Sequence, residues 1–486
     1  MAGERRQPLS QLVEAVAPAQ VLGDSSVEIG ELAYRAHDVV PGALFLCVRG
    51  ARADGHDFAP LALERGAVAL LVERPLDFRV PQVVVPNARI AMPRLADEFF
   101  GRPSAELDVL GVTGTNGKTT TAFLLYEILL AAGRSPGLLG TIESRVGGER
   151  RPAVRTTPES VDLQRTLREM LDTGNRSCAL EATSHGSELG RLDRVRFRAL
   201  AFTNLTQDHL DFHGDMERYF AAKRRLFGDA PAAAVNIGDP WGRRLADELR
   251  REARAALVTY GFAEDADVRP VGLELDSRGA RFRVDGIDVA THLRGRFNVE
   301  NALAALCLAR LARVEGEAIA AGLAAARGVP GRFEPVDEGQ AFTVVVDYAH
   351  TPDSLATALA NARELAGGRV VCVFGCGGDR DRAKRPLMGR VAAERSDVAI
   401  VTSDNPRSED PRAIVEEVLA GAQGRLEVEL DRRAAIERAV EEARSGDVVL
   451  IAGKGHEQGQ EVAGETRPFD DRRVAREALR QLRSRA

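Results

Sequence analysis

The sequence predicts an α/β protein of three domains, and three observations indicate this. The chain has 486 residues, more than one hydrophobic core normally holds, so several domains are expected. Short apolar runs alternate with helical patterns along most of the chain, which is typical of a mostly parallel sheet covered by helices on both faces. A glycine-rich loop at 113–120 separates an apolar run from a helical pattern, giving the order strand, loop, helix.

Two breaks divide this pattern into domains at 1–105, 106–332 and 333–486. A helical pattern at 91–100 ends at Gly-Arg-Pro, and glycine and proline are strong helix interrupters. The middle segment predicts a large, mostly parallel sheet. After 333 the rhythm restarts and predicts a smaller, Rossmann-like α/β domain. Its expected strands are 342–346, 370–374, 398–401 and 448–451.

Composition argues against several classes of protein. A net charge of -6 gives no reason to expect nucleic acid or an anionic membrane as a partner. The N-terminus is polar with no apolar run behind it, so we expect no signal peptide, and no run reaches the length of about 18 apolar residues that a bilayer span needs. The five cysteines lie mostly in apolar runs and indicate buried thiols of a reducing cytoplasm. We expect a cytoplasmic monomer.

The loop at 113–120 has the composition of a phosphate-binding loop. The common pattern places glycine at position 112, where this chain has Val112; the nearest glycines are Gly111 and Gly114, so the loop is a variant. Amides at a helix N-terminus attract an anion, Lys118 adds a positive charge, and the Thr119 hydroxyl can hold Mg²⁺. A turn that merely precedes a helix is the alternative. We expect ATP to bind at Gly114, Thr115, Asn116, Gly117, Lys118, Thr119 and Thr120.

Polar residues follow the next apolar runs. Glu181 ends the run at 178–182, where its carboxylate could complete a Mg²⁺ shell with Thr119; a solvent-facing glutamate is the alternative. Asp208, His209 and Asp211 follow the run at 199–202 and indicate a second Mg²⁺ site. Lys223 lies in a helical pattern, and the pattern alone favours a surface or helix-end lysine.

Charged residues gather at the junction with the last domain. Asn301, near the start of a helical pattern, could contact an adenine edge, although a capping or buried asparagine fits the pattern equally well. Arg332, Asp347 and His350 lie at the junction, which suits a nucleotide enclosed between two domains.

Three loops of the last domain, at 375–381, 404–407 and 453–457, each follow a predicted strand. Arg380 and Arg407 are loop arginines suited to a bidentate grip on a carboxylate. Each loop alone could be an exposed turn, but three at one sheet edge indicate a substrate pocket.

These motifs resemble the Mur ligase family, ATP-dependent amide-forming enzymes of peptidoglycan synthesis. The resemblance covers nearly the whole chain and rests on the motifs at 113–120, 203–211, 297–302 and 347–350. Within the family, the motifs at 156–159, 378–381, 404–407 and 453–457 are similar to those of the members that add diaminopimelate to UDP-MurNAc-L-Ala-D-Glu. The Asp-Asn-Pro-Arg form implies meso-diaminopimelate rather than lysine, because Arg407 can pair with the distal carboxylate that lysine lacks.

The resemblance also implies site residues, with ATP and Mg²⁺ as cofactors. Lys118 and the loop amides would hold the phosphates, and Thr119, Glu181, His209 and a carbamylated Lys223 would hold two Mg²⁺ ions. The ATP pocket would be completed by Asn301, Arg332, Asp347 and His350. The UDP-sugar peptide would contact Thr156, Thr157, Thr183 and Arg191. Diaminopimelate would contact Arg380, Asp404, Asn405, Pro406, Arg407, Gly453 and Glu457.

The implied reaction passes through an acyl phosphate of the D-Glu carboxylate, which the amine then attacks. The chain departs from the family pattern at three places: Ala-Tyr-Arg at 33–35 replaces the usual Asp-Ser-Arg, Leu189 replaces a glutamine, and Thr183 replaces the commoner serine. A sibling ligase, including a folylpolyglutamate-type ligase with the same ATP domain, is the nearest alternative. A nucleotide-binding scaffold without turnover is the alternative from another class.

Overall fold

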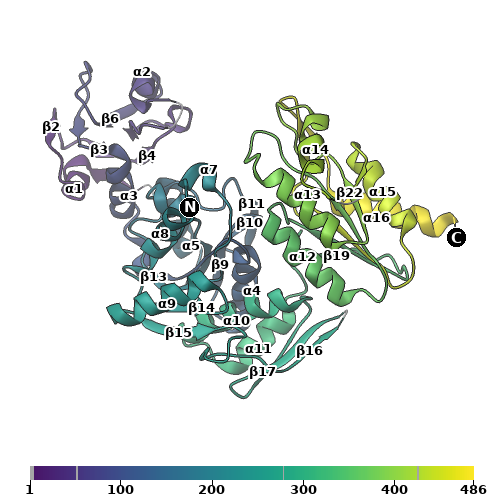
Figure 1. Ribbon diagram of the computed structural model, residues 1–486. Helices are drawn as coiled ribbons and strands as arrows, with labels where there is room; N and C mark the ends of the chain where they lie inside the picture. The colour runs from purple at the N-terminus through teal and green to yellow at the C-terminus, as the bar shows by residue number, and fades with distance from the viewer. Residues whose placement is uncertain (1–4, 51–52, 277, 424–425, 486) are drawn as a thin grey trace.

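A computed structural model describes residues 5–50, 53–276, 278–423 and 426–485 and has the predicted α/β architecture in three domains (Figure 1). The N-terminal sheet has the order β2-β7-β6-β5-β4, in which all neighbours are parallel except β2 and β7. Its strands are β2 Gln20–Leu22, β4 Glu31–Ala33, β5 Ala43–Leu46, β6 Ala67–Val72 and β7 Gln82–Val84, and its helices are α1 Leu9–Glu14, α2 Ala59–Glu64 and α3 Ala88–Phe99. A short pair, β1 Gln7–Pro8 and β3 Glu28–Ile29, lies beside it.

The central sheet has the order β11-β10-β9-β12-β8-β13-β14-β15, and only β10 and β11 run antiparallel to their neighbours. Its strands are β8 Asp108–Thr113, β9 Pro136–Leu139, β10 Glu143–Val146, β11 Glu149–Pro152, β12 Ser177–Glu181, β13 Phe197–Phe202, β14 Ala232–Asn236 and β15 Ala256–Tyr260. The helices of this domain are α4 Lys118–Ala131, α5 Ser160–Asp172, α6 Ser184–Glu188, α7 Leu210–His213, α8 Met216–Arg224, α9 Pro240–Glu252, α10 Arg296–Leu311 and α11 Gly316–Ala325.

Side chains of β8 alternate between two hydrophobic cores, as the period of a strand requires. Leu110 and Val112 pack with α4, α10 and α11 on one face of the sheet, whereas Val109 packs with α5, α8 and α9 on the other. The phosphate-loop strand is therefore covered on both faces, which explains its continuous apolar run.

The C-terminal sheet has the order β19-β20-β24-β21-β22-β23, and only β19 is antiparallel. Its strands are β19 Glu334–Pro335, β20 Thr343–Asp347, β21 Val370–Phe374, β22 Val398–Val401, β23 Glu427–Val428 and β24 Val448–Ala452. Its helices are α12 Pro352–Leu365, α13 Lys384–Arg395, α14 Pro411–Leu419, α15 Arg432–Glu442 and α16 Asp471–Arg485. The four strands predicted for this domain are all confirmed.

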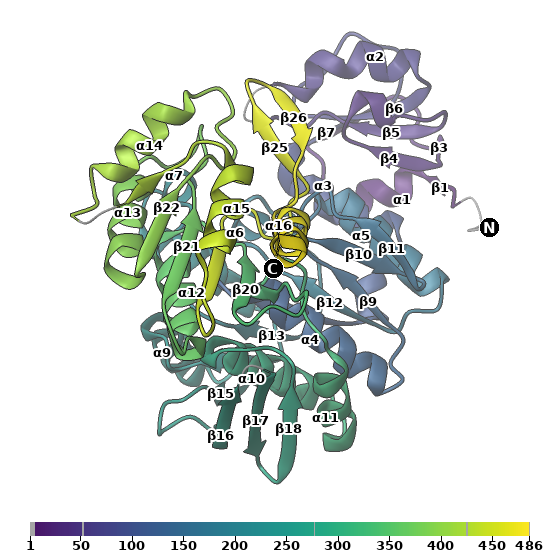
Figure 2. The same cartoon turned by 90° about the vertical axis from the view of Figure 1, so that its right-hand side faces the viewer.

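Two antiparallel elements outside the main sheets were not predicted from the sequence. One is the antiparallel sheet of β16 Val271–Asp276, β17 Gly279–Val284 and β18 Ile287–Thr291, which lies at the edge of the central domain (Figure 1). The other is the hairpin of β25 Gly459–Val462 and β26 Glu465–Pro468, which extends from the C-terminal domain (Figure 2). Among the described residues, no helix is both long and apolar enough to cross a membrane.

The N-terminal domain packs on the central one through both polar and apolar contacts. The Tyr34 hydroxyl donates to Asp162 Oδ2 at 2.5 Å. Arg196 donates from Nη1 to Asp97 Oδ1 and from Nη2 to Asp97 Oδ2, both at 3.0 Å. Val161 of α5 belongs to the hydrophobic core of the N-terminal domain. Tyr34 is therefore an anchor between the two domains.

Candidate functional site

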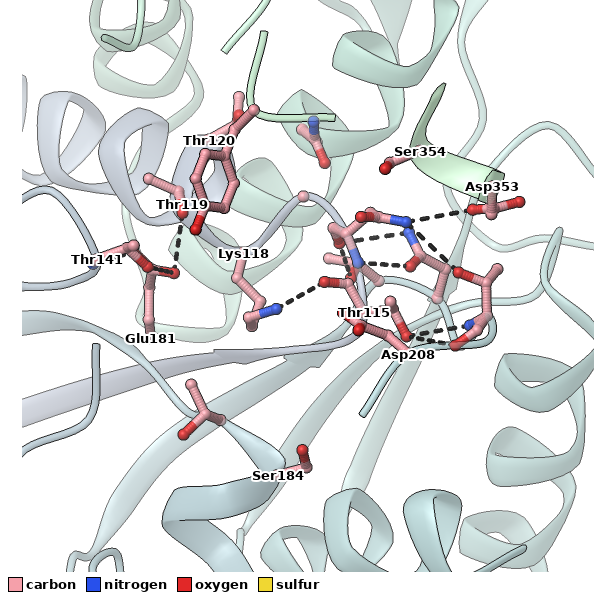
Figure 3. A pocket seen from close by; sticks show the side chains of 18 of the residues that line it. Thr115, Lys118, Thr119, Thr120, Thr141, Glu181, Ser184, Asp208, Asp353 and Ser354 are labelled. Atoms are coloured by element: carbon pink, nitrogen blue, oxygen red, sulfur yellow. Dashed lines mark hydrogen bonds between the residues drawn. The ribbon is translucent and has the colours of Figure 1, made fainter. Parts of the chain in front are cut away.

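A cavity of about 850 Å³ lies between the central and C-terminal domains, and residues of both line it (Figure 3). This volume lies within the range of small-molecule sites. The cavity is bordered by the carboxyl ends of β8, β12, β13 and β20, where ligands bind in parallel α/β sheets.

The loop after β8 forms one wall of the cavity. Gly117 has φ +86°, and a Cβ there would lie 2.3 Å from Asn301 Oδ1, so only glycine fits. Helix α4 begins at Lys118, whose Nζ donates to the carbonyls of Gly114 at 3.0 Å and Thr115 at 2.7 Å. Burial lowers the pKa of Lys118. The lysine is folded back on the loop, beside helix amides suited to bind phosphate.

Glu181 lies next to this loop because β12 pairs with β8 so that Glu181 is opposite Val112. The Glu181 side chain is fully buried, and Thr119 Oγ1 donates to its Oε2 at 3.0 Å. The Thr141 amide donates to Oε1 at 2.7 Å, and the Thr141 hydroxyl donates to Oε2 at 3.0 Å. The adjacent carboxylate and hydroxyl oxygens are the hard donors that Mg²⁺ prefers. A solvent-facing Glu181 is excluded.

Thr141 was missed by sequence reasoning. It follows β9 in a loop without a motif, and only the parallel pairing of β9 with β12 brings it to Glu181.

Lys223 is not a surface residue. It lies in the last turn of α8, 1% exposed, and its Nζ donates to the Gly114 carbonyl at 2.6 Å. Burial and the nearby charge of Lys118 lower the pKa of Lys223 well below its usual value. Its buried amine therefore favours the neutral form.

The expected cluster of three metal ligands after β13 does not form. Asp208 and His209 line the cavity, but Asp211 is exposed, and no group of three or more His, Cys, Asp or Glu residues that could hold a metal occurs in the described part of the chain. His209 stands edge-on to His185, 4.7 Å between ring centres. Burial lowers the pKa of His209 to about 4, so its ring is neutral at pH 7.

Arg332 bridges the two domains. Its Nη2 donates to Thr119 Oγ1 at 3.2 Å, and its guanidinium lies over the ring of Tyr348, 4.5 Å from the centre. A second bridge joins Asn116 Nδ2 to Asp353 Oδ2 at 3.2 Å. The sequence predicted charges at this junction, but not Asp353.

The other predicted ATP-pocket residues also line the cavity. Asp347 accepts a hydrogen bond from the Phe333 amide at 2.6 Å, and burial raises its pKa to about 6. Burial lowers the pKa of His350. Asn301 is buried against Gly117, and its Nδ2 donates to Asn298 Oδ1 at 3.1 Å, so its amide supports the phosphate loop.

The four residues expected to contact the acceptor form one group beside Glu181, and all of them line the cavity. Thr157 Oγ1 donates to the Glu181 carbonyl at 2.8 Å and accepts from Thr183 Oγ1 at 2.9 Å. Thr156 Oγ1 lies 3.1 Å from Thr141 Oγ1. Arg191 donates to the Thr157 carbonyl at 3.3 Å and pairs with Glu159 at 2.9 Å.

The three loops of the C-terminal domain meet at one edge, because they follow the neighbouring strands β24, β21 and β22. Asn405 Nδ2 donates to Glu457 Oε2 at 2.9 Å, which joins two of these loops. Gly453 has φ +124°, and a Cβ there would lie 2.9 Å from Asp404 Oδ2. Pro406 is buried, with its carbonyl oxygen against Gly378.

Arg407 and Arg380 both lie beside Gly377, on the side where a Cβ would stand. Arg407 donates from Nη1 to the Gly378 carbonyl at 2.7 Å and from Nε to Glu461 Oε2 at 3.2 Å. Arg380 is exposed and lines the cavity. The cluster of loops therefore adjoins the cavity through Arg380.

Three segments of the chain match known family domains: residues 28–99 match the Mur ligase family catalytic domain, 112–309 the Mur ligase middle domain, and 331–455 the Mur ligase glutamate ligase domain. A solved UDP-N-acetylmuramoyl-L-alanyl-D-glutamate–2,6-diaminopimelate ligase superposes with a TM-score of 0.70 at 31% identity, covering 98% of this chain and 99% of that one. Folylpolyglutamate synthase from Mycobacterium tuberculosis shares the fold, with a TM-score of 0.62 at 19% identity over 75% of this chain and 92% of that one.

Curated relatives are closer in sequence. The ligase of Solibacter usitatus named UDP-N-acetylmuramoyl-L-alanyl-D-glutamate–2,6-diaminopimelate ligase is 48% identical over 94% of both chains. The protein of the same name from Geobacillus thermodenitrificans is 46% identical over 94% of this chain and 96% of its own. The chain belongs to the Mur ligase family.

Proposed function

We propose that the chain is an ATP-dependent ligase that joins meso-diaminopimelate to UDP-MurNAc-L-Ala-D-Glu in peptidoglycan precursor synthesis. One observation carries the proposal: a single cavity has the phosphate loop with Glu181 on one wall and Arg380, which adjoins the Arg407 loops, on another. The names of the full-length relatives support the substrates.

We propose a separate role for each domain. Residues 1–105 would bind the UDP-sugar, residues 106–332 would bind ATP, and residues 333–486 would bind the amino acid. We expect the chain to act as a monomer. We place the reaction in the cytoplasm.

In the first step, an oxygen of the D-Glu side-chain carboxylate attacks the γ-phosphorus of ATP, and the bond to the β-γ bridging oxygen breaks, releasing ADP. The loop amides and Lys118 hold the phosphates and stabilise the charge that develops on oxygen. In the second step, the amine of diaminopimelate attacks the acyl carbon, phosphate leaves with the bonding electrons, and the nitrogen loses a proton.

Magnesium fits the chemistry of this wall. Thr119 and Glu181 would hold one ion, and His209, Glu181 and carbamylated Lys223 a second; bound Mg²⁺ supplies positive charge against the phosphoryl oxygens. A lysine ammonium is no metal ligand, but a carbamate is a carboxylate-like anion.

An assay of ADP release tests the function. The purified chain with ATP, Mg²⁺ and UDP-MurNAc-L-Ala-D-Glu should release ADP when meso-diaminopimelate is added and far less with L-lysine. Preference for lysine would indicate a sibling ligase and overturn the role of Arg407. Absence of turnover with any acceptor would indicate a scaffold.

We expect Arg407→Ala to raise the KM for diaminopimelate about 10- to 100-fold, because a charge-assisted pair to the distal carboxylate is lost. ATP binding should stay within about twofold, since Arg407 does not line the cavity. Initial rates at varied amino acid and ATP check this, with Arg412→Ala, on the nearby helix α14, as the control. Equal loss for both substrates would make Arg407 a structural residue.

We expect Lys223 to carry a carbamate at neutral pH. Only a neutral amine adds CO₂, and burial lowers the pKa of Lys223, so the reactive form persists to lower pH than for an exposed lysine. As pH falls through the lowered pKa, the amine protonates and the carbamate is lost. The ¹³C spectrum after exposure to ¹³C-bicarbonate should show a carbamate signal that Lys223→Ala lacks. An identical signal in the variant would contradict the assignment.

A further inference from the structure

Lysine is rare in this chain and its positions are informative. Of the 66 lysine and arginine residues, only Lys118, Lys223, Lys384 and Lys454 are lysines. Lys118 and Lys223 bind the phosphate loop, and Lys384 Nζ donates to the His350 carbonyl at 2.9 Å at the domain junction. The ammonium of lysine is a compact point charge, whereas the guanidinium of arginine is planar. The fourth, Lys454, lies in the loop cluster of the C-terminal domain.

Lys454 is fully buried beneath the loop cluster of the C-terminal domain. It follows β24 directly after Gly453, and the Ala452 carbonyl at the end of this strand accepts from Arg432 Nη2 at 3.0 Å. Arg432 is itself held by the fully buried Asp471, at 2.6 and 2.8 Å. The backbone that carries Lys454 is therefore firmly placed.

The ammonium of Lys454 faces three acceptors of the cluster. Its Nζ donates to Asn405 Oδ1 at 2.8 Å, and it lies 3.4 Å from Glu457 Oε2 and 3.5 Å from Asp404 Oδ1. Asn405 and Glu457 are part-exposed above it. A buried ammonium needs such partners. Its positive charge also offsets the repulsion between the carboxylates of Asp404 and Glu457.

Lys454 also sets the orientation of the Asn405 amide. Asn405 Oδ1 accepts from Lys454 Nζ and from the Glu461 amide at 3.1 Å, which uses both lone pairs of that oxygen. Asn405 Nδ2 then faces Glu457 Oε2. A flipped amide would place its NH₂ group against two donors.

We propose that Lys454 is a positioning residue for the amino-acid substrate: its ammonium fixes Asn405 and Glu457 in the arrangement that diaminopimelate meets. This rests on the proposed function. Lys454 acts through these two side chains because it is covered by them and does not line the cavity. Its removal should weaken amino-acid binding and leave ATP binding almost unchanged, because the phosphate loop lies in the central domain and Lys454 does not line the cavity.

The test compares Lys454→Met, which keeps the length but removes charge and donor, with the wild-type chain in the ADP-release assay. We expect the KM for meso-diaminopimelate to rise about 10- to 100-fold, the effect of losing a hydrogen bond to a charged group, while the KM for ATP stays within about twofold. Arg438→Met, which removes an exposed ion pair of the same domain with Glu427 and Glu442, should leave both values unchanged.

A double-mutant cycle separates positioning from a general structural role. If Lys454 acts through Asn405 and Glu457, adding Lys454→Met to the variant that carries Asn405→Ala and Glu457→Ala should cost little more than that variant already loses. The proposal would be overturned if the losses from the separate substitutions multiply. It would also be overturned if Lys454→Met leaves the KM for diaminopimelate unchanged, or raises the KM for ATP in parallel.

Thermal unfolding is followed for each variant. If Lys454→Met does not fold, Lys454→Gln takes its place, because glutamine keeps an N–H donor. The KM values for diaminopimelate and ATP are then compared in the same way. Failure of both to fold would overturn the proposal, because Lys454 would then serve the fold. If diaminopimelate does not stimulate ADP release by the wild-type chain, the proposed function is refuted instead.

Discussion

Replacement of Lys118 by methionine is expected to lower kcat/KM about 10³-fold, the scale of losing a charge aimed at the transition state. Lys118 is the first residue of α4, and its Nζ donates hydrogen bonds to two carbonyls of its own loop, at 3.0 and 2.7 Å. Burial lowers its pKa, and a bound triphosphate would favour the ammonium again. The loss should therefore appear in both nucleotide binding and turnover.

Steady-state ADP release and calorimetric binding of a non-hydrolysable ATP analogue measure the two effects. Arg134→Met, which removes an exposed arginine shortly after the same helix, is the matched control and should leave both unchanged. Activity within about tenfold of wild type in Lys118→Met would show that the loop does not serve the phosphates as proposed.

Glu181→Gln should lower kcat by a similar factor, about 10³-fold, because it weakens the binding of Mg²⁺. The substitution keeps the shape of a fully buried side chain that accepts from Thr119 and Thr141, but it removes the negative charge. A neutral amide is a weaker donor to Mg²⁺, so the Mg²⁺ concentration for half-maximal rate should rise.

Titration of the rate with Mg²⁺ checks this. Glu149→Gln, an exposed glutamate on β11 paired with Arg151 at 2.9 Å, should titrate as wild type does. An unchanged Mg²⁺ dependence in Glu181→Gln would assign the carboxylate to the fold rather than to the metal.

The sequence predicted those parts of the fold that depend on strong local patterns. Buried parallel strands read as unbroken apolar runs, so β8, β12 and β21 were predictable, and the placement of Glu181 followed from its position at a strand end. The three loops of the C-terminal domain were predictable for the same reason.

Other features depend on contacts distant in sequence. The hairpin β25–β26 is polar and part-exposed, so it has no apolar alternation to reveal it, yet its Glu461 holds Arg407. Lys223 lies in an amphipathic-looking helix, and only the return of α8 to the phosphate loop buries it. Thr141 and Lys454 likewise gain their partners by strand order, which local pattern does not encode.

The central claim is that the γ-phosphoryl group of ATP is first transferred to the D-Glu side-chain carboxylate of the acceptor. The amine then attacks the acyl carbon. The most direct measurement uses UDP-MurNAc-L-Ala-D-Glu labelled with ¹⁸O in the D-Glu side-chain carboxylate, with ATP, Mg²⁺ and meso-diaminopimelate. One ¹⁸O atom should appear in each phosphate released, since the acyl carbon loses that oxygen to phosphorus. Phosphate without ¹⁸O, formed while the amide product accumulates, would contradict the account.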